Sequence, residues 1–278
     1  MSNPTHPRLP EEILDCIIDN LNDYELENCC LVSKVWVPRI RKYLFADISL
    51  QDEFDLELWK NTFPDPSTSP ARYTKTLTIT LPEVFTPADA EEGGWLSAFS
   101  RVRHLAIDII GMIQPEISLA PFHGLSPVIK SLRIRLEVAT FPSSRIFDLI
   151  RSFPSLEDLD VEASEELTEC ADGVDGQQTP VKTSVPPTFT GSLKLYLEGG
   201  STPLLRPLLS LPSGLHFREL WLTCDDEEDI SMAAEVVERC CPTLESLKIK
   251  HELRTFVSWL FPLQWLTSVR SMAVSKHL

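Results

Sequence analysis

The residue types that most often carry catalysis or bind metals are scattered along this chain. Its six histidines show no metal-ligand spacing, and its seven cysteines include no C-x-x-C pair. The sequence contains neither the glycine-rich loop that holds phosphates nor the G-x-S-x-G turn of many hydrolases. These absences predict that the chain is not an enzyme and that it uses no cofactor or metal.

Two further groups of residues could suggest chemistry. The acidic run from Asp225 to Asp229 lacks the alternating ligands and central glycine of a calcium loop, and it precedes a predicted helix at Ser231. Because a helix N-terminus favours carboxylates, we interpret this run as a solvated helix start. The cysteines fall mainly at apolar positions, so we interpret them as reduced core residues. They are Cys16, Cys29, Cys30, Cys170, Cys224, Cys240 and Cys241.

Basic and aromatic residues recur two positions apart in short alternating segments, which suits binding rather than catalysis. Alternate side chains of a strand point to opposite faces, so each such pair would share one exposed face. Aromatic and basic residues together are typical of an interface centre, and in an acidic chain they favour an acidic or phosphorylated partner. The predicted substrate-binding residues are Arg133, Arg135, Lys194, Tyr196, Trp221, Lys248 and Lys250.

An alternative for the arginines stays open. Arg133 with Asp160, and Arg135 with Glu162, could simply pair across neighbouring strands, at about 0.2–1 kcal/mol for each pair.

The strands that would carry these residues follow a repeated template. The template is an apolar residue, two variable residues, a leucine and, two positions after the leucine, a second apolar residue. The leucines of successive copies, which we call core positions, are 25 to 28 residues apart, with one interval of 34. The core positions are Leu77, Leu105, Leu132, Leu159, Leu193, Leu220, Leu247 and Met272. The residues predicted to follow them on the exposed face are Thr78, Ala106, Arg133, Asp160, Lys194, Trp221, Lys248 and Ala273, and two positions later Thr80, Asp108, Arg135, Glu162, Tyr196, Thr223 and Lys250.

Helical segments separate the predicted strands. The best examples, 145–153 and 231–241, each end at a proline, Pro154 and Pro242, which stops the helix before the next strand. A strand and a helix cannot bury their apolar faces alone, but stacked copies share a continuous core. The pattern resembles the leucine-rich-repeat family, which implies an α/β horseshoe with parallel strands on the inner face and helices outside. We expect about eight repeats over 74–278, with an inserted loop near 163–188.

The stretch from Leu9 to Phe45 predicts three short helices. Pro10 suits a first helical position, Asp23 could cap a second helix, and Ser33 could cap a third that carries Trp36. Pro38 is expected about a turn inside the third helix, where it would bend it. So small a unit rarely buries all its apolar surface, so some of it should need a partner.

These helices resemble the F-box motif, through Leu9-Pro10-x-Glu12-Ile13-Leu14, Leu21 and Leu31-Val32-Ser33-Lys34-x-Trp36. The resemblance implies an F-box at 9–48, between a flexible lead-in at 1–8 and a connector at 49–73. It implies a substrate-recognition subunit of a cullin-RING (SCF-type) ubiquitin ligase, bound to a Skp-type adaptor and through it to a cullin. The implied adaptor-binding residues are Leu9, Pro10, Ile13, Leu14, Leu31, Val32 and Trp36. Packing of Ile17, Leu21, Leu26 and Trp36 among the helices is the alternative.

Composition limits the partners. The chain has 278 residues, a net charge of −16 and a pI near 4.8, so its field repels nucleic acid and anionic membranes. It has no apolar run long enough to span a membrane, and we expect a cytoplasmic or nuclear protein that binds neither nucleic acid nor membrane. Two other functions remain open: a repeat scaffold whose F-box-like helices only cap the N-terminal end, and a hydrolase or transferase whose site the sequence does not reveal.

Overall fold

A computed structural model describes most of the chain. The described residues are 10–32, 34, 36–81, 93–111, 119–125, 127–138, 141–168, 187, 189–212, 214–251 and 271–276. Leu9, the cap predicted at Ser33 and most of the predicted inserted loop lie outside them.

Three helices form the N-terminal end, as the sequence predicts. They are α1 (Glu11–Ile18), α2 (Asp23–Val32) and α3 (Val37–Leu44). The cap of α2 differs from the prediction, because Asn22 rather than Asp23 precedes the helix. The Asn22 side chain accepts from the Glu25 amide and the Glu25 carboxylate accepts from the Asn22 amide, both at 3.0 Å.

The prediction for Pro38 was wrong. Helix α3 begins at Val37, so this proline lies in the first turn, where its missing N–H costs no helical hydrogen bond. Trp36 accordingly precedes the helix instead of lying on it.

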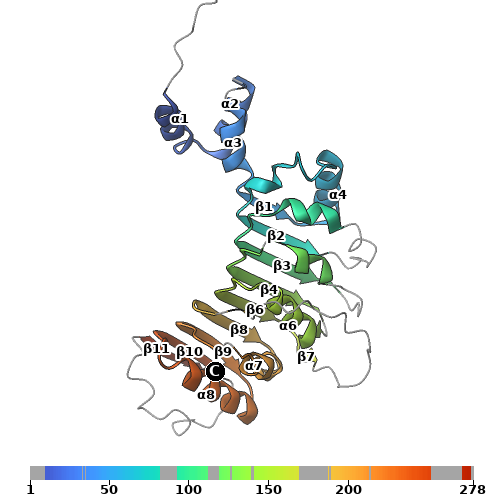
Figure 1. Ribbon diagram of the computed structural model, residues 1–278. Coiled ribbons are helices and arrows are strands. Elements are labelled where there is room, and N and C mark those ends of the chain that lie inside the picture. Colours follow the sequence, from blue (N-terminus) through green and yellow to red (C-terminus); the bar gives the residue numbers. More distant parts are fainter. Residues whose placement is uncertain are drawn as a thin grey trace, which may run out of the picture.

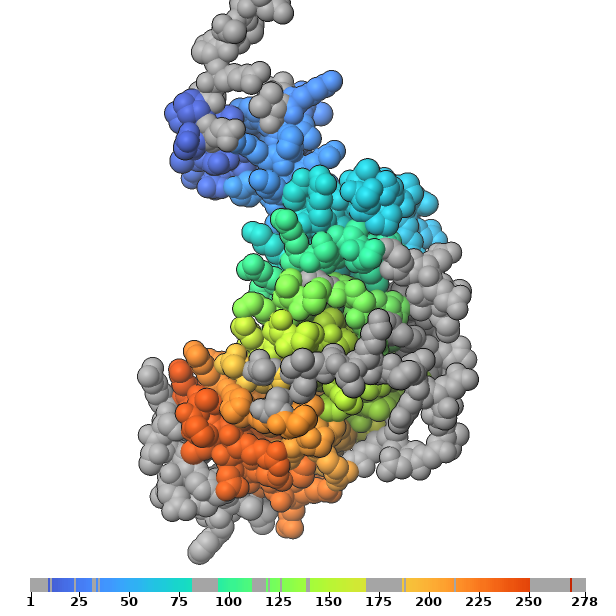
Figure 2. All heavy atoms as spheres, in the orientation of Figure 1, coloured from blue at the N-terminus to red at the C-terminus, as the bar shows by residue number. Residues whose placement is uncertain are grey.

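The helices pack around a small core of their own. Ile18, Leu26 and Ile40 are buried at its centre, and Leu21 and Trp36 are partly buried against them. Figure 2 shows α1–α3 as a lobe at one end of the molecule, in blue.

The rest of the chain is dominated by one open sheet. Within the described residues, nine parallel strands follow one another in chain order. They are β1 (Asp47–Leu50), β2 (Thr76–Leu81), β3 (His104–Ile110), β4 (Ser131–Glu137), β6 (Asp158–Ala163), β8 (Ser192–Leu197), β9 (Glu219–Cys224), β10 (Ser246–His251) and β11 (Ser271–Lys276). Figure 1 shows them stacked along the molecule. A short pair, β5 (Phe141–Pro142) and β7 (Leu167–Thr168), lies apart from the large sheet.

The predicted core positions are in register across eight of these strands. Leu77 pairs with Leu105, and the pairing continues strand by strand to Leu247 and Met272. The expectation of parallel strands at these positions is therefore confirmed. Strand β1 was not predicted; it adds Leu50 to the core and pairs with β2.

Helical segments connect the strands. They are α4 (Glu53–Thr62), η1 (Pro70–Tyr73), η2 (Gly93–Ala98), η3 (Ala120–Gly124), α6 (Ser143–Arg151), α7 (Thr202–Leu209) and α8 (Glu227–Cys240). Helices α6 and α8 begin two and four residues before the predicted positions, and α7 was not predicted. The strands alternate buried and partly exposed residues, so one face packs on the core and the other carries the polar side chains.

Helix α4 covers the first strands of the sheet. Leu56 and Trp59 are buried in the large core, and the Trp59 ring lies 5.5 Å from that of Phe99 and 4.8 Å from that of Phe63. The segment predicted as a connector thus contributes to the core of the sheet.

The start of α8 differs from the predicted solvated acidic run. Asp226 caps the helix by accepting from the Asp229 amide at 2.8 Å, and Asp229 itself is only 2% exposed. Its carboxylate accepts from the Ser201 amide at 2.9 Å and from the Thr202 amide and hydroxyl at 2.8 and 2.7 Å. A carboxylate of one repeat therefore holds the N-terminus of α7 in the preceding repeat.

Replacing Asp229 by alanine should lower the free energy of unfolding by about 3 kcal/mol, because amides that now donate to a charged acceptor would be buried without one. Urea denaturation followed by circular dichroism measures the change. The matched control is Glu227→Ala, an exposed residue of the same helical turn, which should change stability by less than about 0.5 kcal/mol. Similar stabilities for the two variants would contradict the role assigned to Asp229.

The described cysteines differ in how deeply they are buried. Cys224 and Cys240 are buried, and burial raises the pKa of the Cys224 thiol to about 12 and that of Cys240 to about 11. Cys16 is exposed, which corrects its assignment to the core, and it is a free thiol like the other described cysteines.

Iodoacetamide at pH 8 should therefore modify Cys16 in the folded protein while Cys224 and Cys240 stay unmodified, because only accessible thiolates react. Peptide mass mapping identifies the labelled sites, and labelling in urea is the control in which all three react. Modification of Cys224 in the folded protein as fast as that of Cys16 would contradict its placement in the core.

Candidate functional site

The exposed face of the sheet carries the predicted binding residues in two rows. The row that follows the core leucines contains Arg133, Lys194, Trp221 and Lys248, all partly or largely exposed. Two positions later, Arg135, Tyr196 and Lys250 form the second row. Thr223 departs from the prediction because it is 6% exposed; its hydroxyl donates to the Leu195 carbonyl at 3.3 Å.

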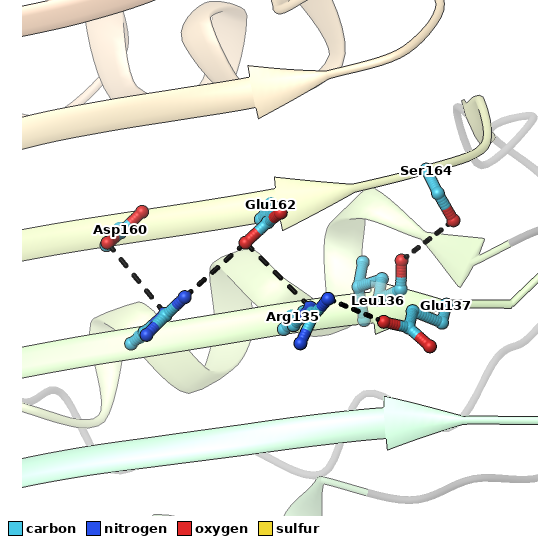
Figure 3. A network of polar contacts seen from close by, with 7 residues as sticks. Arg135, Leu136, Glu137, Asp160, Glu162 and Ser164 are labelled. Atoms are coloured by element: carbon cyan, nitrogen blue, oxygen red, sulfur yellow. Dashed lines mark hydrogen bonds and ion pairs between the residues drawn. The ribbon is translucent and has the colours of Figure 1, made fainter.

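The two arginines of β4 lie within a network of carboxylates, seen in Figure 3. Arg133 is 4.0 Å from Asp160 and 3.5 Å from Glu162, and Arg135 is 3.9 Å from Glu162. A further ion pair joins Arg135 to Glu137 at 2.8 Å. The structure contains the alternative, pairing across strands, so both arginines have acidic neighbours within the chain. All these side chains are partly exposed, so each pair contributes only about 0–1 kcal/mol to stability.

At Asp160, burial has a larger effect on the pKa of the carboxyl group than the nearby positive charges have. Desolvation raises its pKa above the ordinary value, and the nearby charges of Arg133 and Lys194 offset only part of that rise. Ionising this carboxylate therefore costs more in the folded chain than in the unfolded chain.

Two aromatic side chains lie on the strands that follow β6 in the sheet, Tyr196 on β8 and Trp221 on β9. The rings of Tyr196 and Trp221 meet edge to face, with centroids 6.1 Å apart. The Lys248 ammonium lies 3.5 Å from the centroid of the Trp221 ring, and that of Lys194 lies 5.0 Å away. Trp221 therefore holds two ammonium groups through cation–π contacts, each worth about 0.5–1 kcal/mol at an exposed site.

A hollow of about 730 Å³ adjoins this pair, where strands β4 to β10 end. Tyr196, Thr223 and Lys250 line one part of it, and Arg135 lines another. Carboxylates contribute the rest of its charge, namely Glu137, Glu162, Glu198 and Asp225. The structure thus brings Tyr196, Trp221 and Lys248 together, and Tyr196 and Lys250 line the hollow beside them.

The N-terminal helices expose several large apolar side chains. Ile13 on α1 is 48% exposed and Leu31 on α2 is 86% exposed. Tyr24, 74% exposed, lies seven residues before Leu31, which is about two helical turns and places both on one face. Sequence reasoning did not select Tyr24, although this spacing could have indicated it.

The remaining predicted adaptor-binding residues differ from one another in exposure. Pro10 is exposed, and its carbonyl accepts from the Ile13 and Leu14 amides at 3.2 Å. Leu14 is only 7% exposed, and Trp36 is partly buried against the small core of the helices. Leu9 and the side chain of Val32 lie outside the described part of the chain.

These exposed apolar side chains lie on a recognised domain. Residues 7–37 match the family model of the F-box domain. A comparison with curated proteins finds no match to this chain. The chain therefore carries an F-box domain at residues 7–37, and an open parallel sheet follows it in the sequence.

Metal sites and membrane-spanning helices are two further features to consider. The described residues contain no group of three or more histidine, cysteine, aspartate or glutamate side chains arranged to hold a metal ion. No helix among them is long and apolar enough to cross a membrane.

The Asp160→Asn variant should be more stable than the parent chain at pH 7, because the parent must ionise a carboxyl group whose pKa folding raises. Below the ordinary pKa of 3.8, where both folded and unfolded parent chains carry a neutral group, the two proteins should be equally stable. The difference should develop as the pH rises from 3.8 through the raised pKa of the folded state. Urea denaturation from pH 3 to 7 measures it, and a variant that is less stable than the parent at pH 7 would show that the ion pair with Arg133 dominates.

Proposed function

We propose that this chain is the substrate-recognition subunit of a cullin-RING ubiquitin ligase. Its F-box domain would bind a Skp-type adaptor, and the sheet domain would bind a protein substrate. The ligase chemistry would belong to other subunits, while this chain supplies proximity and orientation. The observation that carries the proposal is the F-box match at residues 7–37, on which two apolar side chains, Ile13 and Leu31, are strongly exposed.

The packing of the N-terminal helices supports adaptor binding over the alternative of a simple cap. The first strands of the sheet are already covered by α4, through Leu56 and Trp59. Helices α1–α3 instead bury Ile18, Leu26 and Ile40 around a separate core. Their exposed apolar side chains are thus left for another protein, as expected of an F-box.

For residues 74–278, we propose a leucine-rich-repeat domain. The support is the repeat interval of about 27 residues in the sequence together with the strand-by-strand register of Leu105, Leu132, Leu159, Leu220 and Leu247. Such domains bind partners on their strand face, which here carries the rows of charged and aromatic side chains. An acidic or phosphorylated substrate is the partner that its basic residues favour.

Replacing Ile13 and Leu31 together by alanine should weaken adaptor binding by about tenfold or more, because both apolar side chains would lie at the interface. A pull-down with a purified Skp-type adaptor, quantified by titration, measures the loss.

The matched control removes two apolar side chains of similar exposure outside the F-box match. Phe54 and Leu58 on α4 are 70% and 53% exposed, and their double alanine variant should bind the adaptor as the parent does. Circular dichroism verifies that all three proteins are folded. If the folded parent does not bind the adaptor, the ligase assignment fails.

A further inference from the structure

The basic side chains on the strand face differ in their neighbours, because the register of the strands places acidic residues beside the arginines of β4 and not beside the lysines of β10. Arg133 of β4 pairs in register with Asp160 of β6, and Arg135 pairs with Glu162. The same two carboxylates lie within 4.0 Å of the arginines. A partner that approaches β4 therefore meets basic groups that already have acidic neighbours.

The lysines of β10 have no such neighbours in register. Lys248 pairs with Trp221 on one side and Ala273 on the other, and Lys250 pairs with Thr223 and Ser275. None of these four residues is acidic, and within the described part of the chain neither lysine has a carboxylate within ion-pair distance. Two positive charges of a strongly acidic chain are thus left for an external anion.

Trp221 organises this region, which we call the Trp221 patch and define as Tyr196, Trp221, Lys248 and Lys250. The indole ring holds the Lys248 ammonium at 3.5 Å, which limits the freedom of a flexible side chain before any partner binds. The Trp221 Nε1 is buried and has no acceptor among the described residues, so the ring is placed by packing rather than by a hydrogen bond. A rigid aromatic centre beside lysines lowers the entropy cost of binding.

The adjoining hollow restricts where an anion can lie. Tyr196 and Lys250 belong to both the patch and the lining of the hollow, and four carboxylates line the hollow as well: Glu137, Glu162, Glu198 and Asp225. These carboxylates would repel an acidic group, so the hollow itself disfavours an anion and the patch beside it is the more favourable position.

We infer that the Trp221 patch docks an acidic, aspartate- or glutamate-rich segment of the substrate protein, with its carboxylates on Lys248 and Lys250. The inference rests on the proposed function, because it assigns the substrate class to the strand face of that receptor. Carboxylates are favoured over phosphate because the arginines, whose planar group binds phosphate bidentately, are engaged in ion pairs at β4.

The test measures binding of a labelled eight-residue peptide of alternating glutamate and alanine to the purified full chain, by fluorescence anisotropy at low salt. The same peptide with glutamine for glutamate is the neutral probe. The parent should bind the acidic peptide about fivefold or more tightly than the neutral one, as expected for two or three exposed charge pairs. The Lys248→Gln, Lys250→Gln variant should lose this preference, and Lys248→Arg, Lys250→Arg should keep it.

The matched control is Arg101→Gln, Arg103→Gln, which removes the same charge from two exposed residues that precede β3 and line neither the patch nor the hollow, and it should change the affinity by less than about twofold. An equal loss in this control would show that net charge governs binding and would overturn the inference. It would also be overturned if the parent did not distinguish the two peptides, or if only a phosphoserine version bound through the lysines.

Adaptor binding by the same preparations separates this inference from the proposed function. Loss of the peptide preference with adaptor binding intact overturns the patch alone. If the chain binds the peptide through the lysines but does not bind the adaptor, the result supports the patch and overturns the ligase assignment.

Discussion

The packing of leucines from successive strands, held in register, is the interaction on which the rest of the structure depends. Each strand contributes side chains that are almost fully buried, such as Leu132, Leu159 and Leu220, and each repeat needs its neighbours to bury them. Because side chains of a strand alternate, burying the leucines turns the residues between them to the opposite face. Ionic and aromatic groups from distant parts of the chain are thereby aligned in rows. The strand face is thus a consequence of the core, and a shift of one residue in register would turn those rows inward.

The same arrangement separates two surfaces with different physical character. The F-box end exposes apolar side chains, Ile13 and Leu31, on helices that have their own small core. The strand face is polar: the arginines of β4 have acidic neighbours, whereas the lysines of β10 have none in ion-pair distance among the residues that the structure describes. An apolar surface suits a lasting complex, whereas a charged and partly solvated one suits reversible recognition. This division agrees with a receptor that stays with its ligase and exchanges substrates.

Much of the sheet could be predicted from the sequence, because the 27-residue interval and the alternating pattern report directly on burial. Strand β1 was missed because Asp47–Leu50 is short and carries Ile48 where the template has a leucine, although Ile48 lies 29 residues before its partner Leu77, close to the repeat interval. The buried role of Asp229 was also missed, since five consecutive acidic residues look alike until α7 from the preceding repeat is placed against them. At the site, the alternation placed Trp221 and Tyr196 on one face, but it could not decide whether the arginines were free. That depended on the distances from Arg133 and Arg135 to Asp160 and Glu162, which only the packed strands define.

The central claim is that one end of the chain binds an adaptor while the strand face stays available for a substrate. Hydrogen–deuterium exchange of the full chain, with and without a Skp-type adaptor, tests it directly. We expect that adding the adaptor slows exchange in α1 to α3 and leaves exchange in β8, β9 and β10 unchanged. Protection of those strands by the adaptor, or no protection of the N-terminal helices, would contradict it.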